Sequence, residues 1–90
     1  MGEEPDREID ALRARLTAVD ERLVAALNER IELVANLKQA KVERGIDFHD
    51  PEREAWLLDH LAATSAGPLS DEGLREIFQR VLALTKRELD

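Results

Sequence analysis

Apolar residues recur every three or four positions from Ile9 to Ala40, which is the spacing of one face of an α-helix. The surrounding segment, residues 6–44, has no internal Gly or Pro and is rich in the good helix formers Ala, Leu, Glu and Arg. Gly45 follows it and supplies a typical C-terminal stop. The pattern therefore predicts one long amphipathic helix. In heptad terms, its inward positions are Ile9, Leu12, Leu16, Val19, Leu23, Ala26, Arg30, Leu33, Leu37 and Ala40.

Two shorter helices are predicted after the long one. Asp50 followed by Pro51 is typical of an N-cap and the first helical position, so a second helix should run from Pro51 to about Ala63. Ser70 is the next N-cap, and a third helix should continue almost to the C-terminus. The apolar faces consist of Leu57, Leu58 and Leu61 in the second helix, and of Leu74, Ile77, Phe78, Val81, Leu82 and Leu89 in the third. The sequence thus predicts an all-α fold, one long and two shorter helices, in a single domain over residues 1–90.

The length of the first helix indicates how the chain assembles. A helix of about 38 residues is about 57 Å long, whereas a compact domain of 90 residues has a diameter of about 30 Å. About half of the apolar stripe would therefore face water in a monomer. We expect a homodimer in which the long helices of two chains pack against each other, antiparallel or interlocked.

The composition excludes several classes of function. The chain has no Cys, which rules out disulfides and thiolate metal sites, and His49 and His60 lack the spacing of a zinc site. The formal net charge of −7 opposes binding to nucleic acids or anionic membranes, and an aromatic content of 3% leaves few platforms for stacking bases. The N-terminus has no apolar run typical of a signal peptide or membrane span. We expect a cytoplasmic protein that needs no metal or cofactor and binds neither nucleic acid nor membrane.

Arg30 occupies an inward position of the long helix, where a leucine would be usual. A guanidinium keeps its proton and is costly to bury without an anionic partner, so water or a negative ligand should reach it. Lys41 and Arg13 flank the same stripe, and in an antiparallel dimer Arg13 of one chain can approach Arg30 and Lys41 of the other. Structural roles are also open: Arg30 could set the helix register or pair with Glu54, and the other two could be solvated rim charges.

Further polar residues lie on the shorter helices. Glu54 is on the apolar side of the second helix, where a carboxylate requires a cation or a hydroxyl as its partner. Asp50 is explained by helix capping, and Arg53 could extend over apolar surface beside Trp56. Thr85 points inward from the third helix, unless its hydroxyl bonds back to the preceding turn. With the cations, these side chains suggest an interior site for a compact dianion whose reaction needs only folding and electrostatic stabilisation.

Six segments of the chain, in this order and spacing, resemble the all-helical class of chorismate mutase. They are residues 9–13, 19–23, 27–30, 38–41, 50–54 and 77–80. The resemblance covers nearly the whole chain and implies an intertwined homodimer with two active sites, each built from both chains. It also implies the Claisen rearrangement of chorismate to prephenate in phenylalanine and tyrosine biosynthesis, without a cofactor or proton transfer.

The resemblance assigns roles to the cations of the first helix. Arg13 would reach into the partner's site and bind one substrate carboxylate, while Arg30 would bind the other from within its own chain. Lys41 would contact the ether oxygen, which becomes more negative as the bond breaks. Catalysis would therefore depend on Arg30 and Lys41 together with a carboxylate of the second helix.

That carboxylate is Glu54, which, like Asp50, matches a position that contacts the substrate hydroxyl. Arg53 matches a position that supports this region. Thr85 matches a small polar residue near a substrate carboxylate. These four residues complete the substrate-binding set that the resemblance implies on the two shorter helices.

The C-terminal end departs from the family pattern. Family members commonly place a glutamine four residues after the small polar residue, where it donates a second hydrogen bond to the ether oxygen, whereas this chain has Leu89. The neighbouring Glu88 could replace it only if the helix end shifted register and the carboxyl were protonated. Loss of one such donor typically costs about 3 to 4 kcal/mol of transition-state stabilisation. The chain would then be slow by itself, or another shikimate-pathway enzyme would bind and reshape this end, as some short family members require.

Two other functions stay open from the sequence. One is an isochorismate pyruvate lyase of the same fold, which would release salicylate instead of prephenate. The other is a non-catalytic helical dimer that serves as a regulatory module, for which Leu89 is the best support.

Overall fold

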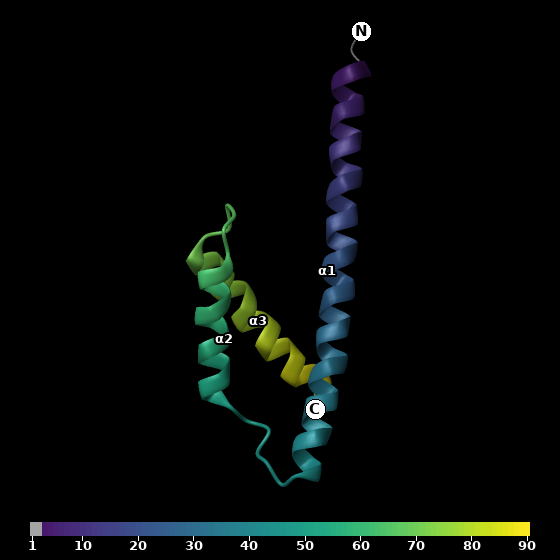
Figure 1. Cartoon of the computed structure of the whole chain (residues 1–90). Helices are drawn as coiled ribbons and strands as arrows, with labels where there is room; N and C mark the ends of the chain where they lie inside the picture. Colours follow the sequence, from purple (N-terminus) through teal and green to yellow (C-terminus); the bar gives the residue numbers. More distant parts are fainter. Residues whose placement is uncertain (1–2) are drawn as a thin grey trace. The chain divides into compact units, whose positions relative to one another are not determined.

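The computed structural model describes residues 3–90 and contains three α-helices, with no strand in that range. They are α1 (Glu3–Glu43), α2 (Pro51–Thr64) and α3 (Asp71–Leu89), as Figure 1 shows. The all-α fold of one long and two shorter helices is confirmed, and the predicted helix ends differ from the observed ones by a few residues at most. None of the described helices combines the length and the apolar character needed to cross a membrane.

The chain divides into two units, residues 1–32 and residues 33–90. From Glu3 onward, the first unit is the N-terminal part of α1. The second unit holds the last turns of α1, the following loop, α2 and α3. That the two units form one domain stays a prediction.

In the first unit the apolar stripe is exposed. Ile9, Leu12, Leu16, Val19 and Leu23 each expose between 41% and 61% of their surface. Most helix stability in proteins comes from packing of the apolar face, and one helix alone offers nothing for that face to pack against. The stripe therefore requires a packing partner outside this unit.

The end of α1 has the geometry that Gly45 predicts. Gly45 has a φ of 65°, in the left-handed region where glycine carries no steric penalty. Its N–H donates to the carbonyl of Val42 at 3.2 Å, and the N–H of Ile46 donates to the carbonyl of Lys41 at 2.9 Å. These two bonds form a Schellman motif, which satisfies carbonyls that the helix itself leaves without partners.

Both predicted N-caps are present in the second unit. Asp50 Oδ1 accepts a hydrogen bond from the N–H of Arg53 at 3.0 Å, and this cap begins α2. Ser70 Oγ accepts one from the N–H of Gly73 at 3.0 Å and begins α3. Each cap satisfies one of the free N–H groups in the first turn and so fixes where its helix begins.

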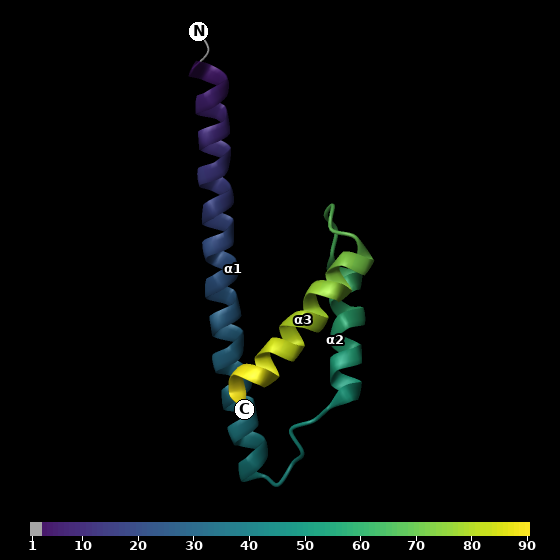
Figure 2. The same ribbon diagram turned by 180° about the vertical axis from the view of Figure 1, so that it is seen from behind.

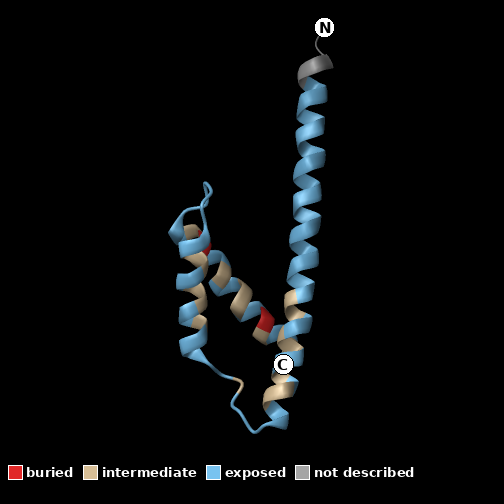
Figure 3. Cartoon of the chain, viewed as in Figure 1, coloured by how far each residue is buried: buried red, intermediate tan, exposed pale blue. Residues whose placement is uncertain are grey.

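α2 and α3 pack against each other, and in Figures 1 and 2 α3 runs from the α2–α3 loop to the last turns of α1. Of the described side chains, only Leu74 and Thr85 are buried, and both lie on α3 (Figure 3). Half-buried apolar residues of these two helices include Leu57, Leu58, Leu61, Phe78, Val81, Leu82 and Leu89.

The prediction that α3 buries Ile77 is wrong for the single chain, in which this residue is 50% exposed. Ile77 and Leu84 are seven residues apart and therefore lie on the same flank of α3. Leu84 is 44% exposed. The apolar face of α3 is thus wider than the part that is covered within its own unit.

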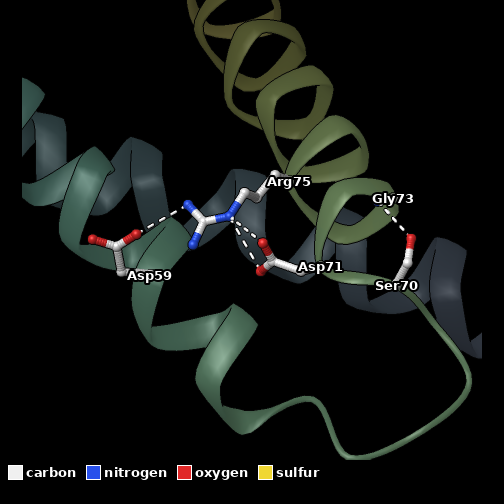
Figure 4. A network of polar contacts seen from close by, with 5 residues as sticks. All are labelled: Asp59, Ser70, Asp71, Gly73 and Arg75. Carbon is white, nitrogen blue, oxygen red and sulfur yellow. Dashed lines mark hydrogen bonds and ion pairs between the residues drawn. The ribbon is translucent and has the colours of Figure 1, made fainter.

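Arg75 links α2 and α3 near the loop that joins them (Figure 4). Its Nη1 donates to Asp59 Oδ1 of α2 at 2.9 Å, and its Nε donates to Asp71 of α3 at 3.1 and 3.2 Å. The hydrogen bond to Asp59, together with that to Asp71, raises the pKa of Arg75 above its ordinary value. The guanidinium thus binds a carboxylate of each helix and holds α2 and α3 together at this end.

Candidate active site

α1 places the two predicted arginines in the first unit. Arg13 extends into solvent, with 77% of its side chain exposed and Nη1 4.0 Å from Asp10 Oδ1. Arg30 is half-buried, whereas the described side chains that precede it in α1 are exposed. In the single chain Arg13 is a solvated charge, and its place in a partner's site stays a prediction.

Lys41 lies at the end of α1, beside the loop that leads to α2. Its Nζ donates to the backbone carbonyl of Phe48 at 3.4 Å and lies 5.9 Å from the centroid of the Phe48 ring. Lys38, one turn earlier, has its Nζ 5.5 Å from the same centroid and donates to the carbonyl of Leu89 at 3.2 Å. Two ammonium groups thus flank one aromatic ring, an arrangement favoured by the ring quadrupole. Since an ammonium has three donors, Lys41 keeps capacity for a ligand.

Arg53 extends along the surface of α2, as its spacing to Trp56 indicates. The guanidinium carbon of Arg53 lies 4.1 Å from the centroid of the Trp56 ring. Trp56 in turn stacks on His60, with centroids 4.6 Å apart and an angle of 9° between the planes. Asp50, which precedes them, caps α2. Both interpretations drawn from the sequence for Asp50 and Arg53, capping and coverage of apolar surface, are confirmed.

Of the two kinds of partner expected for Glu54, a cation or a hydroxyl, the structure shows a cation. Oε1 of Glu54 lies 2.6 Å from Nζ of Lys86 in the last turn of α3, and their side chains are 34% and 38% exposed. Lys86 was not among the site residues predicted from the sequence. Its position in the sequence could have indicated this contact. Lys86 follows the inward-facing Thr85 on the third predicted helix, which was expected to pack beside the second helix, where Glu54 lies.

The C-terminal part of α3 contains three more predicted site residues. Thr85 is buried, and its Oγ1 donates to the carbonyl of Val81 at 2.7 Å, so the bond back to the preceding turn is present. Leu89 is half-buried and is the last residue of the helix, while Glu88 is exposed. The Lys38 ammonium, through its bond to the Leu89 carbonyl, ties this end of α3 to α1 within the second unit.

The second unit therefore brings together Glu54 and Lys86 from different helices and joins Lys38 to the end of α3. Arg13 and Arg30 belong to the first unit. Among the described residues, no group of three or more His, Asp or Glu side chains could hold a metal ion. The available chemistry is that of ammonium and guanidinium donors, carboxylate acceptors and one hydroxyl, which can bind and orient a polar, charged ligand.

Three helices, with cations on the long one and an ion-paired carboxylate on a shorter one, define an all-helical protein. The sequence model of the family described as chorismate mutase type II matches residues 12–88. The chain belongs to the chorismate mutase type II family. The match begins one residue before Arg13 and ends one residue before Leu89.

Two solved structures from Thermus thermophilus are similar to this chain over nearly its whole length. Chorismate mutase (Form II) superposes with a TM-score of 0.84 at 31% identity, covering 89% of this chain and 91% of the other. Chorismate mutase (Form I) superposes with a TM-score of 0.83 at 32% identity, covering 87% and 98%. The three-helix arrangement is therefore that of structures bearing this name.

Curated relatives are longer proteins. The bifunctional chorismate mutase/prephenate dehydratase of Stutzerimonas stutzeri is 35% identical over 82 residues, which are 84% of this chain and 22% of that protein. The protein of the same description from Pseudomonas aeruginosa is 30% identical over 81 residues, again 84% and 22%. The chain thus spans about a fifth of the length of these relatives.

Proposed function

We propose that the chain catalyses the Claisen rearrangement of chorismate to prephenate. The observation that carries the proposal is the family match over residues 12–88, which includes every residue predicted to bind the substrate except Leu89. In this reaction the ether C–O bond breaks while a C–C bond forms within the same molecule. The protein therefore needs only to hold one conformation and to stabilise the charge that develops on the ether oxygen.

Substrate binding depends on the arginines of α1. Arg30 of one chain binds one carboxylate of chorismate, and Arg13 of the partner chain binds the other. Planar guanidinium groups suit this task because they donate two parallel hydrogen bonds to a carboxylate. With both carboxylates held, the enolpyruvyl arm lies over the ring in a chair-like pose. The substrate then loses its conformational freedom on binding and not in the chemical step, which lowers the activation barrier.

Stabilisation of the transition state depends on Lys41. Its ammonium contacts the ether oxygen, which gains negative charge as the C–O bond lengthens, so the contact is stronger in the transition state than in the ground state. Glu54 and Asp50 contact the ring hydroxyl and so fix the ring, with Arg53 supporting this region and Thr85 lying near a carboxylate.

We further propose that the active form is a homodimer with two sites, each built from both chains. The exposed apolar stripe of the first unit and the exposed flank of α3 at Ile77 and Leu84 support this assembly. The stripe and the flank would each find a packing partner on a second chain. In a twofold dimer both surfaces would be covered on both chains.

A complex with another shikimate-pathway enzyme is part of the proposal. Relatives described as bifunctional chorismate mutase/prephenate dehydratase carry a second activity in the same polypeptide. A separate chain could obtain such a neighbour by association, and contact near Leu89 would alter the end of α3. A cytoplasmic location likewise stays a prediction.

The test is an assay of the purified chain with chorismate, which follows the loss of its diene absorbance and identifies the product. Prephenate formation, and binding of a transition-state analogue more tightly than chorismate, are the expected results. The assay is repeated with the organism's first shikimate-pathway enzyme added, and a rise in rate is expected. Salicylate from isochorismate would indicate the lyase instead, while a chain that neither reacts nor binds the analogue would be a regulatory module.

A further inference from the structure

The ion pair between Glu54 and Lys86 joins the first turn of α2 to the last turn of α3, 32 positions apart in sequence. Both side chains are about one-third exposed, whereas the Arg13–Asp10 pair on α1 exposes 77% of each side chain. Partial burial reduces screening by solvent and limits the number of geometries that the two side chains can adopt. The Glu54–Lys86 pair is therefore better defined than an ordinary surface ion pair.

Lys86 also lies among residues already assigned to the site. Thr85 precedes it and is buried, and Leu89, one turn later, accepts the hydrogen bond from Lys38. The opposite end of the α2–α3 pair is held by Arg75 with its two aspartates. The Glu54–Lys86 pair at one end and the Arg75 contacts at the other together hold the first turn of α2 close to the last turn of α3.

The chemistry of the pair suits the role that Glu54 has in the proposed function. A carboxylate offers about four acceptor positions, and the ammonium engages Oε1, so capacity remains for a substrate hydroxyl. An isolated carboxylate beside chorismate, which carries two carboxylates, would repel the substrate. The Glu54–Lys86 pair has no net charge, and the carboxylate can still accept a hydrogen bond from the substrate.

We propose that Lys86 is a positioning residue of the substrate site, which holds the Glu54 carboxylate toward the ring hydroxyl and offsets its charge. This inference rests on the proposed mutase function. Because the hydroxyl contact is made in the ground state and the transition state alike, loss of Lys86 should act mainly on KM.

The test compares Lys86→Met with Lys86→Arg, each alone and combined with Glu54→Gln, in the full-length chain with chorismate as the substrate. Lys86→Met should lower kcat/KM about tenfold, mainly through KM, while Lys86→Arg should retain most of the activity. In the Glu54→Gln background the further Lys86→Met change should have little effect, since the partner charge is already absent. Arg87→Met, which removes an exposed cation of the same turn, is the matched control and should leave kinetics unchanged.

The possible outcomes separate the inference from the proposed function. A wild-type chain that does not convert chorismate overturns both. An active wild type with normal Lys86→Met kinetics overturns the role of Lys86 alone, as does an equal loss in both backgrounds, because Lys86 would then act independently of Glu54. Helical circular dichroism and thermal unfolding accompany each variant, and if Lys86→Met is unfolded, Lys86→Gln takes its place in the same comparison.

Discussion

At Leu89 the resemblance to the family predicts a glutamine that donates to the ether oxygen, and an apolar side chain cannot donate. It is half-buried at the last position of α3, so a longer polar side chain could be accommodated there without disturbing a core. We expect Leu89→Gln to raise kcat at least about tenfold, since one such donor is typically worth more than this in related sites. Steady-state kinetics with chorismate measure the change.

Leu89→Met is the matched control for that experiment, because it has a similar volume and no donor group. A gain in both variants would show that flexibility at the helix end, not a hydrogen bond, limits the rate. No gain in either would mean that the side chain at this position does not reach the substrate.

Arg30 is the residue that most clearly separates a catalytic role from a structural one. We expect Arg30→Ala to lower kcat/KM about a hundredfold or more, because a substrate carboxylate loses its charged partner. Stability should change little, because Arg30 is only half-buried and the loss of its contacts within the chain is offset by the desolvation that the guanidinium no longer undergoes. Chorismate kinetics and urea unfolding at a fixed protein concentration measure the two effects.

The opposite pattern, a large loss of stability with normal kinetics, would assign Arg30 to the helix register. Arg30→Lys is the intermediate case: it keeps the charge but loses the planar fork, so activity should fall while stability changes little.

At individual residues, contacts between neighbours in the sequence were easier to predict than contacts between residues far apart in the sequence. The role of Asp50 as a cap follows from its position before Pro51, and the path of Arg53 over Trp56 follows from their spacing on one helix. The need of Glu54 for a cation or a hydroxyl could be predicted from its place on an apolar face. That the cation is Lys86 could not, because this contact depends on how α2 and α3 pack and not on any short-range pattern.

At the scale of elements, the two helix caps offer a test that separates stability from substrate binding. Asp50→Ala and Ser70→Ala each remove a side chain that accepts from a first-turn N–H, so each should destabilise the chain by about 1 kcal/mol. Only Asp50→Ala should also lower kcat/KM, by about tenfold, because Asp50 is proposed to contact the substrate hydroxyl.

Ser70→Ala therefore serves as the control for the stability cost of losing a cap. Urea unfolding gives the stabilities, and chorismate kinetics are measured where both variants remain folded. Equal activities in the two variants would restrict Asp50 to capping.

Three of the helix ends were predictable because each has a local chemical cause: the caps at Asp50 and Ser70, and the left-handed Gly45. The extent of burial was not. The prediction for Ile77 failed because the period of α3 identifies an apolar face but not how much of that face one neighbouring helix covers. The exposed flank of α3 therefore bears on how two chains assemble and not on how one chain folds.

At the scale of the whole molecule, the sequence predicted a dimer from the length of the first helix, and the exposed stripe in the structure is in keeping with that prediction. We expect a mass of about twice 10.2 kDa by light scattering at micromolar concentration, and a thermal midpoint that rises with protein concentration. Leu16→Glu places a charge in the stripe, where Leu16 is 61% exposed in the single chain, and should shift the protein toward monomer or unfolded chain. A wild-type monomer would contradict the assembly.

Shared active sites have a consequence that a simple dimer does not. If Arg13 of one chain completes the site that contains Arg30 of the other, then Arg13→Ala and Arg30→Ala homodimers each lack one arginine in every site. A mixed dimer has one site with both arginines and one site with neither. Random reassortment of equal amounts of the two variants should therefore restore about a quarter of wild-type activity, because half of the dimers are mixed and each has one intact site.

The two variants are unfolded together in urea, refolded, and assayed with chorismate. Arg13→Ala refolded with the double variant Arg13→Ala/Arg30→Ala is the control, because every site in that mixture lacks at least one arginine and no activity should return. If the two single variants also recover nothing, while wild type refolded in the same way is active, Arg13 and Arg30 act within one chain. Recovered activity, in contrast, requires that the two arginines of a site come from different chains, which no property of a single chain can imitate.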